Sequence, residues 1–582
     1  MNGPRLIPAV ICLLVAGVCG CGAEKSHQAD RIFDDQAMKF FKELDTTSLR
    51  MLAAQYGGRP AGALDSLATD GVSRITGTEK PEGVAAVAAY CEFYFNAGKY
   101  LNKPIIFVKS KKIRPIVART LQGSDLAVFR RTNRIPPASI MLGSGLTVAR
   151  RASKDLNVRD MIAAGRITME DAEATRSAGA LGDRWNELYD DEARRVPMAR
   201  LGGRYVAFIN IELCLLPGSG QDWPGITEVL VGSGGHTHSA GCELIANLRD
   251  AWKNYDAEGV NAIIAKIKDV GSAGKGYPDA SRLKWELFYN DIHKGHPAFV
   301  GFVAAFIMFI VAIATNRRWA RNSAMAIMIL STLVITAAWI LRWIAGGEAW
   351  YLPPMMKQYG AMLSSAVLAA VLAVILELFR KYNYIALAAA FYGAVVLVWV
   401  YFGNMIMGPD SVNSSISAAK GILKDPLMII HVSVIVVGHA LAGMTVVTSV
   451  AYVGIAFFKG LEGKSTSSAP GLFGPVGNSS LAVVDRCNLI LAQIACWTLI
   501  VGTLLGAWWA DYAWSRWWGW DAKETWALIT CLLFVVVLHV RFVLPSRYRG
   551  LLTAVFCILG GVAMLFNWFV VNYLFSGLHS YG

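Results

Sequence analysis

The segment WWGWDAKETW, residues 517–526, places four tryptophans, two carboxylates and a lysine within ten residues. Trp508, Trp509 and Trp514 precede it, which makes seven tryptophans in nineteen residues. Indole rings are broad and apolar with one donor, so a dense group of them suits a flat, largely apolar ligand. An aromatic belt at a membrane interface is the ordinary alternative, but a belt distributes tryptophans over many helix ends. The clustering favours a dedicated binding surface.

Two histidines flank this part of the chain. His431 lies near the start of one apolar stretch, and His579 lies just after the last one. Two imidazoles can ligate an iron from opposite sides while indoles pack against the apolar faces of a porphyrin. Alone, each histidine would more often be an ordinary interfacial residue. A joint role therefore requires that both lie on the same side of a membrane as the tryptophans.

The charged residues of the segment also have ordinary explanations. Asp521 and Glu524 are three residues apart just before an apolar stretch, which is the spacing of a capping box. Asp521 would accept from first-turn amides and Glu524 would reach back to the cap, so the pair would fix the helix start and with it the tryptophans. Arg516 and Lys523 suit porphyrin propionates, although such side chains also extend to interfaces without any ligand.

Two further histidines lie deeper within apolar stretches. His539 follows Glu524 by fifteen residues, about 22 Å along a helix, and His439 follows His431 by eight, about 12 Å. Ionisable residues inside a membrane usually face a partner or a cavity. A structural role near a basic helix end competes with a ligand role for His539. For His439 we expect a hydrogen bond to a neighbouring helix.

The remaining histidines carry weaker signals. The segment GSGGHTHSAGCEL brings together three residues of types that can bind a metal ion, His236, His238 and Cys242. No fourth ligand is apparent, which weakens the case for a metal site. His293 and His296, in IHKGHP, resemble interfacial residues.

The elements that must position these residues are transmembrane helices. The chain has 582 residues, of which 54% are hydrophobic and only 17% charged, and the apolar runs begin at residue 296. The sequence predicts an α-helical polytopic membrane protein with about eight transmembrane helices and an N-terminal mixed α/β extracytoplasmic domain. The expected spans are 297–315, 323–345, 360–379, 384–403, 427–457, 487–508, 524–543 and 550–574.

Loop charge predicts the orientation. Every second loop between the apolar stretches is basic, so we expect these loops to be cytoplasmic. They are NRRWARN, RKYNY, the stretch from KGLEGK to DR, and VRFVLPSRYRG. The opposite loops are aromatic, glycine-rich or nearly neutral. The N-terminal domain, the tryptophans, His431 and the C-terminus with His579 then share the extracytoplasmic side.

Residues 1–21 have the layout of a secretory signal, either conventional, uncleaved, or of the lipoprotein type with Cys21 lipidated. Residues 22–290 form the expected exported domain, in which 37–55 and 240–255 have helical periodicity and 103–110 and 203–211 resemble strands. Its three cysteines allow at most one disulfide, and CxxCH, the motif of c-type haem attachment, occurs nowhere in the chain.

Residues 297–582 resemble a known family. WWGWDAKETWALIT resembles the WWD signature of haem-handling proteins, in the variant of the CcsA (ResC) type of System II cytochrome c biogenesis. Three further segments resemble segments of the family and occur in the same order along the chain: LMIIHVSV, LHVRF and NYLFSGLHSYG. GGRPAGALDSLATDGVSRITG resembles the domain that precedes CcsA in some fused relatives, and Arg342 in RWIAGG resembles the family's arginine at the end of the second helix.

The resemblance implies roles by position. His431 and His579 correspond to the external histidines that hold haem at the WWD loop, 508–526, and His539 to the transmembrane histidine of the haem entry path. The loop residues that the resemblance places at the haem are Trp517, Trp518, Trp520, Asp521 and Trp526. The implied ligand is b-type haem, both substrate and transiently bound. The implied activity is that of a subunit of a cytochrome c synthase, which presents haem for attachment to the CxxCH motif of apocytochrome c.

The implied partners are a ResB (CcsB)-type membrane protein, apocytochrome c and a thiol-reducing thioredoxin-like protein, in the cytoplasmic membrane and without nucleic acid. The ResB-type half has no counterpart in this chain, so a separate partner would supply the second transmembrane histidine. Where relatives usually have tyrosine this chain has His439. This difference raises the hypothesis that His439 and His539 pair within one subunit. Haem delivery without synthase activity, a b-type electron-transfer subunit, and a transporter are the alternatives.

Overall fold

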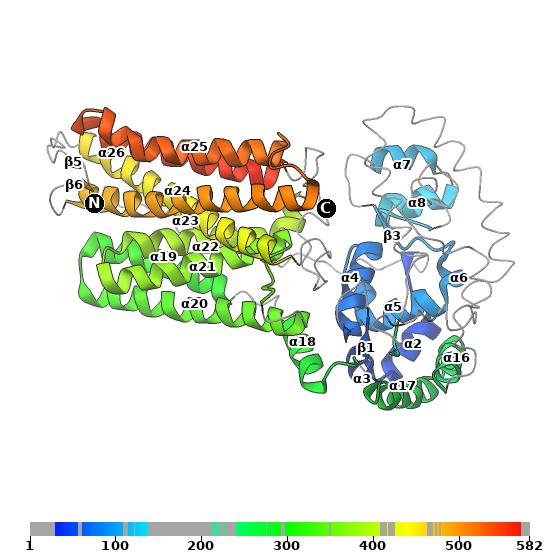
Figure 1. Cartoon of the computed structure of the whole chain (residues 1–582). Coiled ribbons are helices and arrows are strands. Elements are labelled where there is room, and N and C mark those ends of the chain that lie inside the picture. The colour runs from blue at the N-terminus through cyan, green and yellow to red at the C-terminus, as the bar shows by residue number, and fades with distance from the viewer. Residues whose placement is uncertain are drawn as a thin grey trace, which may run out of the picture.

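The computed structural model describes the chain in two parts, a long helical bundle and an N-terminal region beside one end of it (Figure 1). The described residues are 30–55, 61–108, 114–121, 123–137, 214–217, 223, 226, 240–274, 276–292, 297–347, 351–407, 416, 425–461, 470–471, 474–475 and 479–571.

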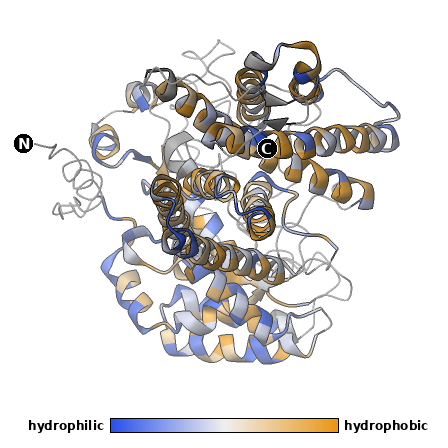
Figure 2. Cartoon of the chain, turned by 90° about the vertical axis from the view of Figure 1, so that its left-hand side faces the viewer, coloured by the Kyte–Doolittle hydropathy of each residue, from blue (hydrophilic) through white to orange (hydrophobic). Residues whose placement is uncertain are grey.

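Eight helices are long and apolar enough to cross a membrane, which confirms the predicted polytopic helical fold. They are α19 (Pro297–Thr315), α20 (Arg318–Gly346), α21 (Gln358–Arg380), α22 (Tyr384–Met407), α23 (Pro426–Leu461), α24 (Ser480–Trp514), α25 (Ala522–Val543) and α26 (Ser546–Leu565), the last continued by a π-helix, η4 (Phe566–Val571). Their surfaces are mainly hydrophobic, whereas the N-terminal helices alternate hydrophilic and hydrophobic residues (Figure 2). The apolar surface that the bundle shows to its surroundings is therefore the surface expected of a protein in lipid.

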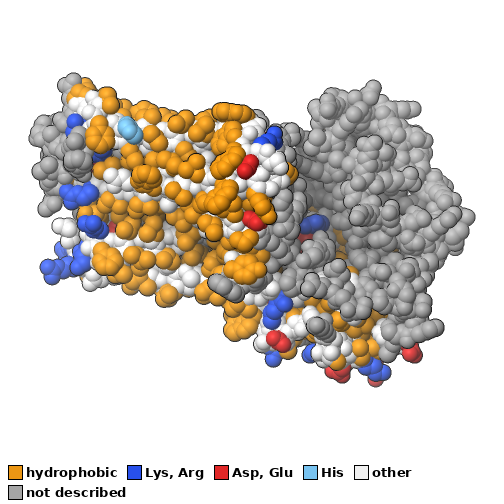
Figure 3. Space-filling model, viewed as in Figure 1, with side chains coloured by type: hydrophobic (Ala, Val, Ile, Leu, Met, Phe, Trp, Pro, Cys, Tyr) orange, Lys and Arg blue, Asp and Glu red, His pale blue; other side chains and the backbone are white. Residues whose placement is uncertain are grey.

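The two ends of the bundle differ in charge. Lysine and arginine side chains gather at the end away from the N-terminal region, which we call the basic end (Figure 3). There Glu377 accepts hydrogen bonds from the backbone N–H groups of Asn383 (2.8 Å) and Ile385 (3.1 Å) and so caps the start of α22. Arg541 and Asp485 form a buried ion pair between α25 and α24. At the other end α24 joins α25 through the tryptophan segment, so we call it the tryptophan end.

The described N-terminal region is mostly helical, with strands of only two residues. Its helices are α2 (Asp35–Glu43), α3 (Thr46–Arg50), α4 (Leu64–Thr76), η2 (Pro81–Gly83), α5 (Ala86–Phe95), α6 (Ala97–Tyr100), α7 (Arg114–Thr120), α8 (Gly123–Thr132), α16 (Ala240–Lys253), α17 (Ala257–Ser272) and α18 (Ala280–Ile292). Antiparallel pairs join β1 (Ala53–Ala54) to β2 (Gly62–Ala63) and β3 (Ile106–Phe107) to β4 (Arg134–Ile135). A third pair, β5 (Pro470–Gly471) with β6 (Gly474–Pro475), lies between α23 and α24.

These elements refine the sequence expectations. The predicted helices at 37–55 and 240–255 are present, the first split into α2 and α3 before β1. The expected strand at 103–110 is reduced to the two residues of β3, and the one at 203–211 lies outside the described residues. In the described part the sheet component is therefore smaller than a mixed α/β domain implies.

A buried carboxylate organises the N-terminal core. Glu92 on α5 is fully buried and accepts hydrogen bonds from Trp252 Nε1 (2.9 Å), Tyr100 Oη (2.9 Å) and Tyr255 Oη (2.8 Å). Burial, followed by the nearby Glu92 carboxylate, raises the pKa of both tyrosines well above the usual range. The phenols therefore remain protonated donors, and the network ties α5 and α6 to the end of α16.

Helix α18 connects the two parts. Arg50 on α3 pairs with Asp65 (2.8 Å) and with Asp291 near the end of α18 (2.6 Å). On the bundle side Arg342 of α20 donates to Tyr289 Oη of α18 (3.2 Å). Helix α18 is therefore bonded both to the N-terminal region and to the tryptophan end of the bundle.

Candidate functional site

The tryptophan segment is a short turn held by its own carboxylates. Asp521 caps α25 by accepting from the Glu524 backbone N–H (2.8 Å), as the sequence predicts. Glu524 reaches back as expected but accepts from the Gly519 backbone N–H (2.7 Å) instead of from the cap residue. Trp520 has a left-handed backbone, with φ of 57°, which turns the chain between these two groups. The pair therefore fixes the tryptophan turn as well as the helix start.

The seven indoles do not share one environment. Trp508, Trp517 and Trp520 are 55%, 56% and 71% exposed. Trp509 is buried against Met428 of α23, so it is a packing residue that joins α24 to α23. Trp517 and Trp520 in the turn and Trp508 near the end of α24 therefore leave large apolar faces uncovered at the tryptophan end.

The other two indoles of the segment are held by aromatic contacts. Trp518 lies edge-to-face with Trp520, with ring centroids 6.0 Å apart. Trp526, in the first turn of α25, packs on Phe566 of η4 with ring centroids 4.1 Å apart. The second contact attaches the start of α25, directly after the turn, to the π-helix that follows α26.

His431 lies at the tryptophan end, on the first turns of α23. Its Nδ1 lies 2.7 Å from the Gly502 carbonyl oxygen of α24. A carbonyl only accepts, so Nδ1 carries the proton and Nε2 carries the lone pair. The ring also lies against Gly506, where an added Cβ would come within 2.6 Å of His431 Cε1. This imidazole therefore has a fixed tautomer of the kind that metal-ligating histidines adopt, with one N–H held by a carbonyl.

His539 has a different setting. It is exposed on the outer surface of α25, and its Nδ1 bonds to the Val535 carbonyl of its own helix at 2.8 Å. Nε2 is again the nitrogen with the lone pair. The residues that share this outer stripe, Leu532, Val536 and Val543, are 53%, 39% and 79% exposed. A ligand bound to His539 would therefore lie at the surface of the bundle, not inside it.

His439 does not make the hydrogen bond expected from sequence. Its ring packs edge-to-face on Trp568 of η4, with centroids 4.8 Å apart, and its buried Nδ1 has no hydrogen-bond partner in the described structure. Because Trp526 contacts the same π-helix, His439 lies at the depth of the first turns of α25. His539 is thirteen residues beyond Trp526, about 20 Å along the helix. The structure therefore does not bring His439 and His539 together.

Several predicted residues lie outside the described part of the chain. These are His579, His236, His238, His293, His296, Cys21 and the side chain of Cys242. Arg516 is exposed within the tryptophan turn, and its guanidinium covers Gly519, so that a Cβ there would come within 2.9 Å of Nη2.

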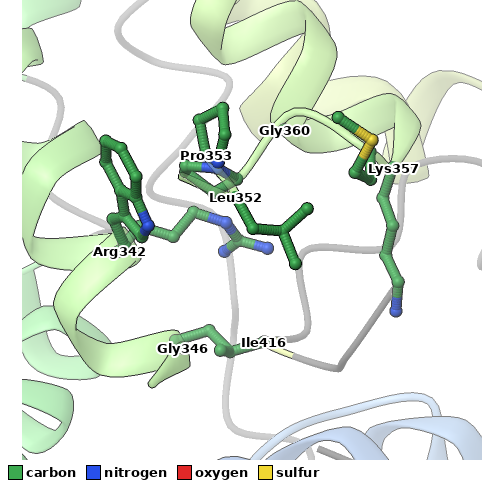
Figure 4. A pocket seen from close by; sticks show the side chains of 10 residues that line it. Arg342, Gly346, Leu352, Pro353, Lys357, Gly360 and Ile416 are labelled. Atoms are coloured by element: carbon green, nitrogen blue, oxygen red, sulfur yellow. The ribbon is translucent and has the colours of Figure 1, made fainter. Parts of the chain in front are cut away.

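A pocket at the tryptophan end was not foreseen from the sequence. It lies between the end of α20, the loop that follows and the start of α21. Figure 4 shows the Arg342 guanidinium beside Leu352, with the Lys357 side chain on the other side of Leu352. The signal available in the sequence was an arginine late in an apolar stretch, followed closely by YLPPMMK.

Buried charges within the spans do not outline a transport path. In the described bundle Arg541 pairs with Asp485, Glu377 caps α22, and Arg342 lies 4.5 Å from the centre of the Tyr359 ring. Each charge has a local structural contact near a helix end. This arrangement gives the transporter alternative no support, because a substrate path requires charges that face a shared channel.

Comparisons with known proteins agree on one family. Residues 355–579 match the family described as cytochrome C assembly protein. A cytochrome c biogenesis protein CcsA of Nandina domestica is 32% identical over 189 residues, which cover 28% of this chain and 58% of the relative. CcsA of Prochlorococcus marinus (strain MIT 9303) is 29% identical over 312 residues, 50% of this chain and 94% of the relative.

Two further comparisons are more partial. The protein NrfI of Wolinella succinogenes is 28% identical over 316 residues, 52% of this chain but 32% of its own length. A solved structure of the cytochrome c heme lyase CcmF aligns with 49% of this chain and 46% of its own at 18% identity and a TM-score of 0.37, a likeness too slight to carry an argument.

Proposed function

The membrane half of this chain belongs to the cytochrome c assembly protein family and is of the CcsA type, and on that premise we propose that it holds haem at the tryptophan turn and presents it to apocytochrome c. In this proposal the chain is a subunit of a cytochrome c synthase. Haem is its substrate, bound as b-type haem before attachment. The proposal concerns the tryptophan end of the bundle.

The observation that carries the proposal is the setting of His431. Its Nδ1–H is held by the Gly502 carbonyl at 2.7 Å, so the lone pair on Nε2 suits an axial bond to iron. The ring lies on α24 near Gly506, two residues before Trp508. A histidine with this tautomer, at the end of the bundle that carries the exposed indoles, suits a porphyrin: the imidazole can bind the iron and the indoles can pack on its apolar faces.

The tryptophan turn supplies the second part of the site. Trp517 and Trp520 are the most exposed indoles of the segment, and the Glu524 bond to Gly519 holds the turn that presents them. We propose that their faces pack on the porphyrin, with Trp518 and Trp526 supporting them and Asp521 fixing the helix start. His579 is proposed as the second axial ligand. Arg516 would meet a propionate.

The chemistry that this site must assist is addition of a thiol across a vinyl group. A C–S bond forms while the thiol proton passes to the neighbouring vinyl carbon, so no net oxidation occurs. The thiols must be reduced and the vinyl groups must face them. The protein's contribution is therefore orientation and shielding from bulk water, which raise the rate without an acid or base of its own. One imidazole must leave the iron when the histidine of CxxCH binds.

His539 is proposed as a ligand for haem entering through the membrane. Because it is exposed on the outer surface of α25, a second ligand must come from outside the bundle. A ResB-type membrane partner fits this requirement, and a thioredoxin-like reductant would keep the client thiols reduced. We place the chain in the cytoplasmic membrane with the tryptophan end, the N-terminal domain and the C-terminus outside, since the basic end is then cytoplasmic.

Maturation of a reporter cytochrome tests the proposal. The full chain is co-produced with a ResB-type partner and an apocytochrome, and covalent haem is scored by the haem peroxidase signal on denaturing gels. His431→Ala and His579→Ala should each abolish the signal. His439→Phe is the matched control, because it changes a histidine of the same helix that is buried against Trp568 and keeps an aromatic contact there.

The same experiment separates synthesis from delivery. If the His431 variant retains full maturation, the proposed site is wrong. If purified complex attaches haem to apocytochrome without further proteins, the synthase role holds. If attachment needs an added lyase while haem still binds, the chain delivers haem only.

A further inference from the structure

His539 and Arg541 lie on opposite faces of α25. Two residues turn an α-helix by about 200° and raise it by about 3 Å, so side chains at this spacing share one depth but point in opposite directions. His539 is exposed on the outer surface of the bundle, whereas Arg541 is 2% exposed and donates from Nη2 to Asp485 Oδ1 of α24. The contact that Arg541 makes inside the bundle therefore lies at the depth of the exposed imidazole.

The apolar side chains of α25 do not by themselves decide which face points outward. The outer stripe contains Leu532, Val536 and Val543, and the buried face contains Phe534 and Val537. Both sets are apolar, and lipid tails solvate either of them well. The rotation of this helix must therefore be fixed by contacts more specific than the burial of apolar surface.

The buried face of α25 includes one aromatic and one ionic contact with its neighbours. Phe534 packs on Gly560 of α26, where an added Cβ would come within 2.8 Å of the ring. Arg541 and Asp485 form the ion pair with α24. When a helix rotates in lipid, an apolar side chain exchanges one apolar neighbour for another, but a separated ion pair leaves two uncompensated charges. The ion pair therefore resists rotation more strongly than the aromatic contact does.

The two charged groups depend on each other. Arg541 Nε and Nη1 and Asp485 Oδ2 are buried and make no hydrogen bond in the described structure. Burying two charges costs about as much free energy as their attraction contributes, so apolar residues of similar size would stabilise the bundle equally well. What such a pair adds is specificity, because only one rotation of α25 brings the two groups together.

Asp485 is itself on a helix that is bonded to another neighbour. Three residues further along α24, Asn488 donates from Nδ2 to Ser449 Oγ at 2.8 Å and accepts from Thr448 Oγ1 at 2.9 Å. Both partners are on α23. The ion pair therefore orients α25 against two helices that are already bonded to each other at this depth.

We propose that Asp485 and Arg541 are positioning residues for His539: their ion pair fixes the rotation of α25 so that the imidazole faces out of the bundle, toward a partner in the membrane. The bond from Nδ1 to the Val535 carbonyl orients the ring on the helix, and the ion pair orients the helix. A haem held between His539 and a histidine of the partner requires both. The ligand role of His539 rests on the proposed function, whereas its orientation does not.

Carbene footprinting tests the orientation without haem. The full chain in lipid nanodiscs is labelled with a lipid-soluble diazirine, and mass spectrometry compares the label on the outer stripe with the label on Phe534 and Val537. Asp485→Leu combined with Arg541→Met removes the pair without leaving an unpaired charge, so this double variant should fold. It should lose the contrast between the two faces, because label then reaches the buried one. Arg541→Lys keeps the charge beside Asp485 and should keep the contrast.

Asn488→Leu is the matched control for the footprint. It removes a buried polar group of the same helix, but one that bonds to α23 instead of α25, so it should keep the contrast. A contrast in the double variant equal to that of the wild type would overturn the proposal. An equal loss of contrast in Asn488→Leu would overturn it as well.

A second measurement connects the orientation to haem. In the complex with a ResB-type partner, His431→Ala removes the ligand at the tryptophan end, and the optical spectrum then reports the low-spin haem that depends on His539. Adding the double variant should abolish this haem, and adding Asn488→Leu should not. Retention of the haem by the double variant overturns the positioning role. If no low-spin haem depends on His539 in this background, the proposed haem entry fails, while the footprint still decides whether the ion pair orients α25.

Discussion

At the scale of single residues, the site depends on which hydrogen bond each side chain makes. The Gly502 carbonyl determines that His431 exposes Nε2, and the Gly519 amide determines where Glu524 points. Both acceptor and donor are backbone groups of the neighbouring element. Changing Glu524 therefore alters the position of the tryptophan turn without removing an indole, whereas changing His431 removes the imidazole itself.

Replacing Glu524 with alanine should loosen the tryptophan turn. The Gly519 amide loses its carboxylate acceptor, and the loss of such a bond costs about 1 kcal/mol or somewhat more. We expect faster hydrogen exchange over residues 515–521 and weaker haem retention, while α25 stays folded because Asp521 still caps it. Exchange and retention equal to wild type would show that Glu524 does not hold the turn.

The residue-scale predictions from the sequence succeeded where the interaction is local. The Asp521 cap follows from a spacing of three, and the structure has it. The partner of Glu524 and the packing of His439 on Trp568 depend on a left-handed Trp520 and on the π-helix after α26, neither of which leaves a periodic signal. The pocket escaped prediction because its walls come from α20, a loop and α21 at once.

At the scale of elements, α23 and α24 approach closely along a line of glycines. Gly438 faces Leu499, Gly502 faces Ile435, and Gly506 faces His431. Small residues let helices in a membrane come close enough for backbone groups to be reached from the partner helix. The contact between His431 and the Gly502 carbonyl depends on this approach.

Gly506→Val should displace the imidazole of His431. An added Cβ would come within 2.6 Å of the ring, and overpacking of this kind costs about 1–3 kcal/mol. We expect a loss of bound haem in the purified protein with only a modest fall in its melting temperature. Gly454→Val on the neighbouring helix α23 is the control, because no atom lies within 4 Å of a Cβ there. Equal haem content in both variants would contradict the assigned contact.

The eight spans could be predicted closely from hydropathy, since length and apolarity determine them. Their ends shifted by several residues: α24 extends from Ser480 to Trp514, whereas the apolar run suggests 487–508. Ser479 caps this helix and Ser515 ends it with a left-handed backbone, and caps of this kind lie outside any hydrophobic pattern. The extension is what places Trp509 and Trp514 on a helix.

At the scale of the whole molecule, α18 joins a soluble-type core to a membrane bundle. The N-terminal core is built around the buried carboxylate of Glu92, whereas the buried charged groups of the bundle lie near its two ends. Arg50 pairs with Asp291 and Arg342 bonds to Tyr289, two residues apart near the end of α18, so both parts of the chain are bonded to the same short segment of this helix.

The N-terminal core should lose stability at high pH. Burial and Glu92 raise the pKa of Tyr100 and Tyr255, so the folded state retains protons that the unfolded chain loses above about pH 10. The free energy of unfolding should then fall by about 1.4 kcal/mol per pH unit for each proton retained. This loss of stability can be measured as the protease resistance of residues 30–137 between pH 8 and about 11.5. Tyr100→Phe with Tyr255→Phe should flatten the decline, and an unchanged slope would contradict the account.

The most direct test of the central claim is the optical spectrum of haem in purified His431→Gly protein with and without imidazole. The account predicts that the variant loses the low-spin bands, and that added imidazole restores them by filling the space beside Gly502 and Gly506. His439→Gly treated in the same way should keep the wild-type spectrum throughout. Low-spin haem in His431→Gly without imidazole would contradict the claim that this histidine holds the iron.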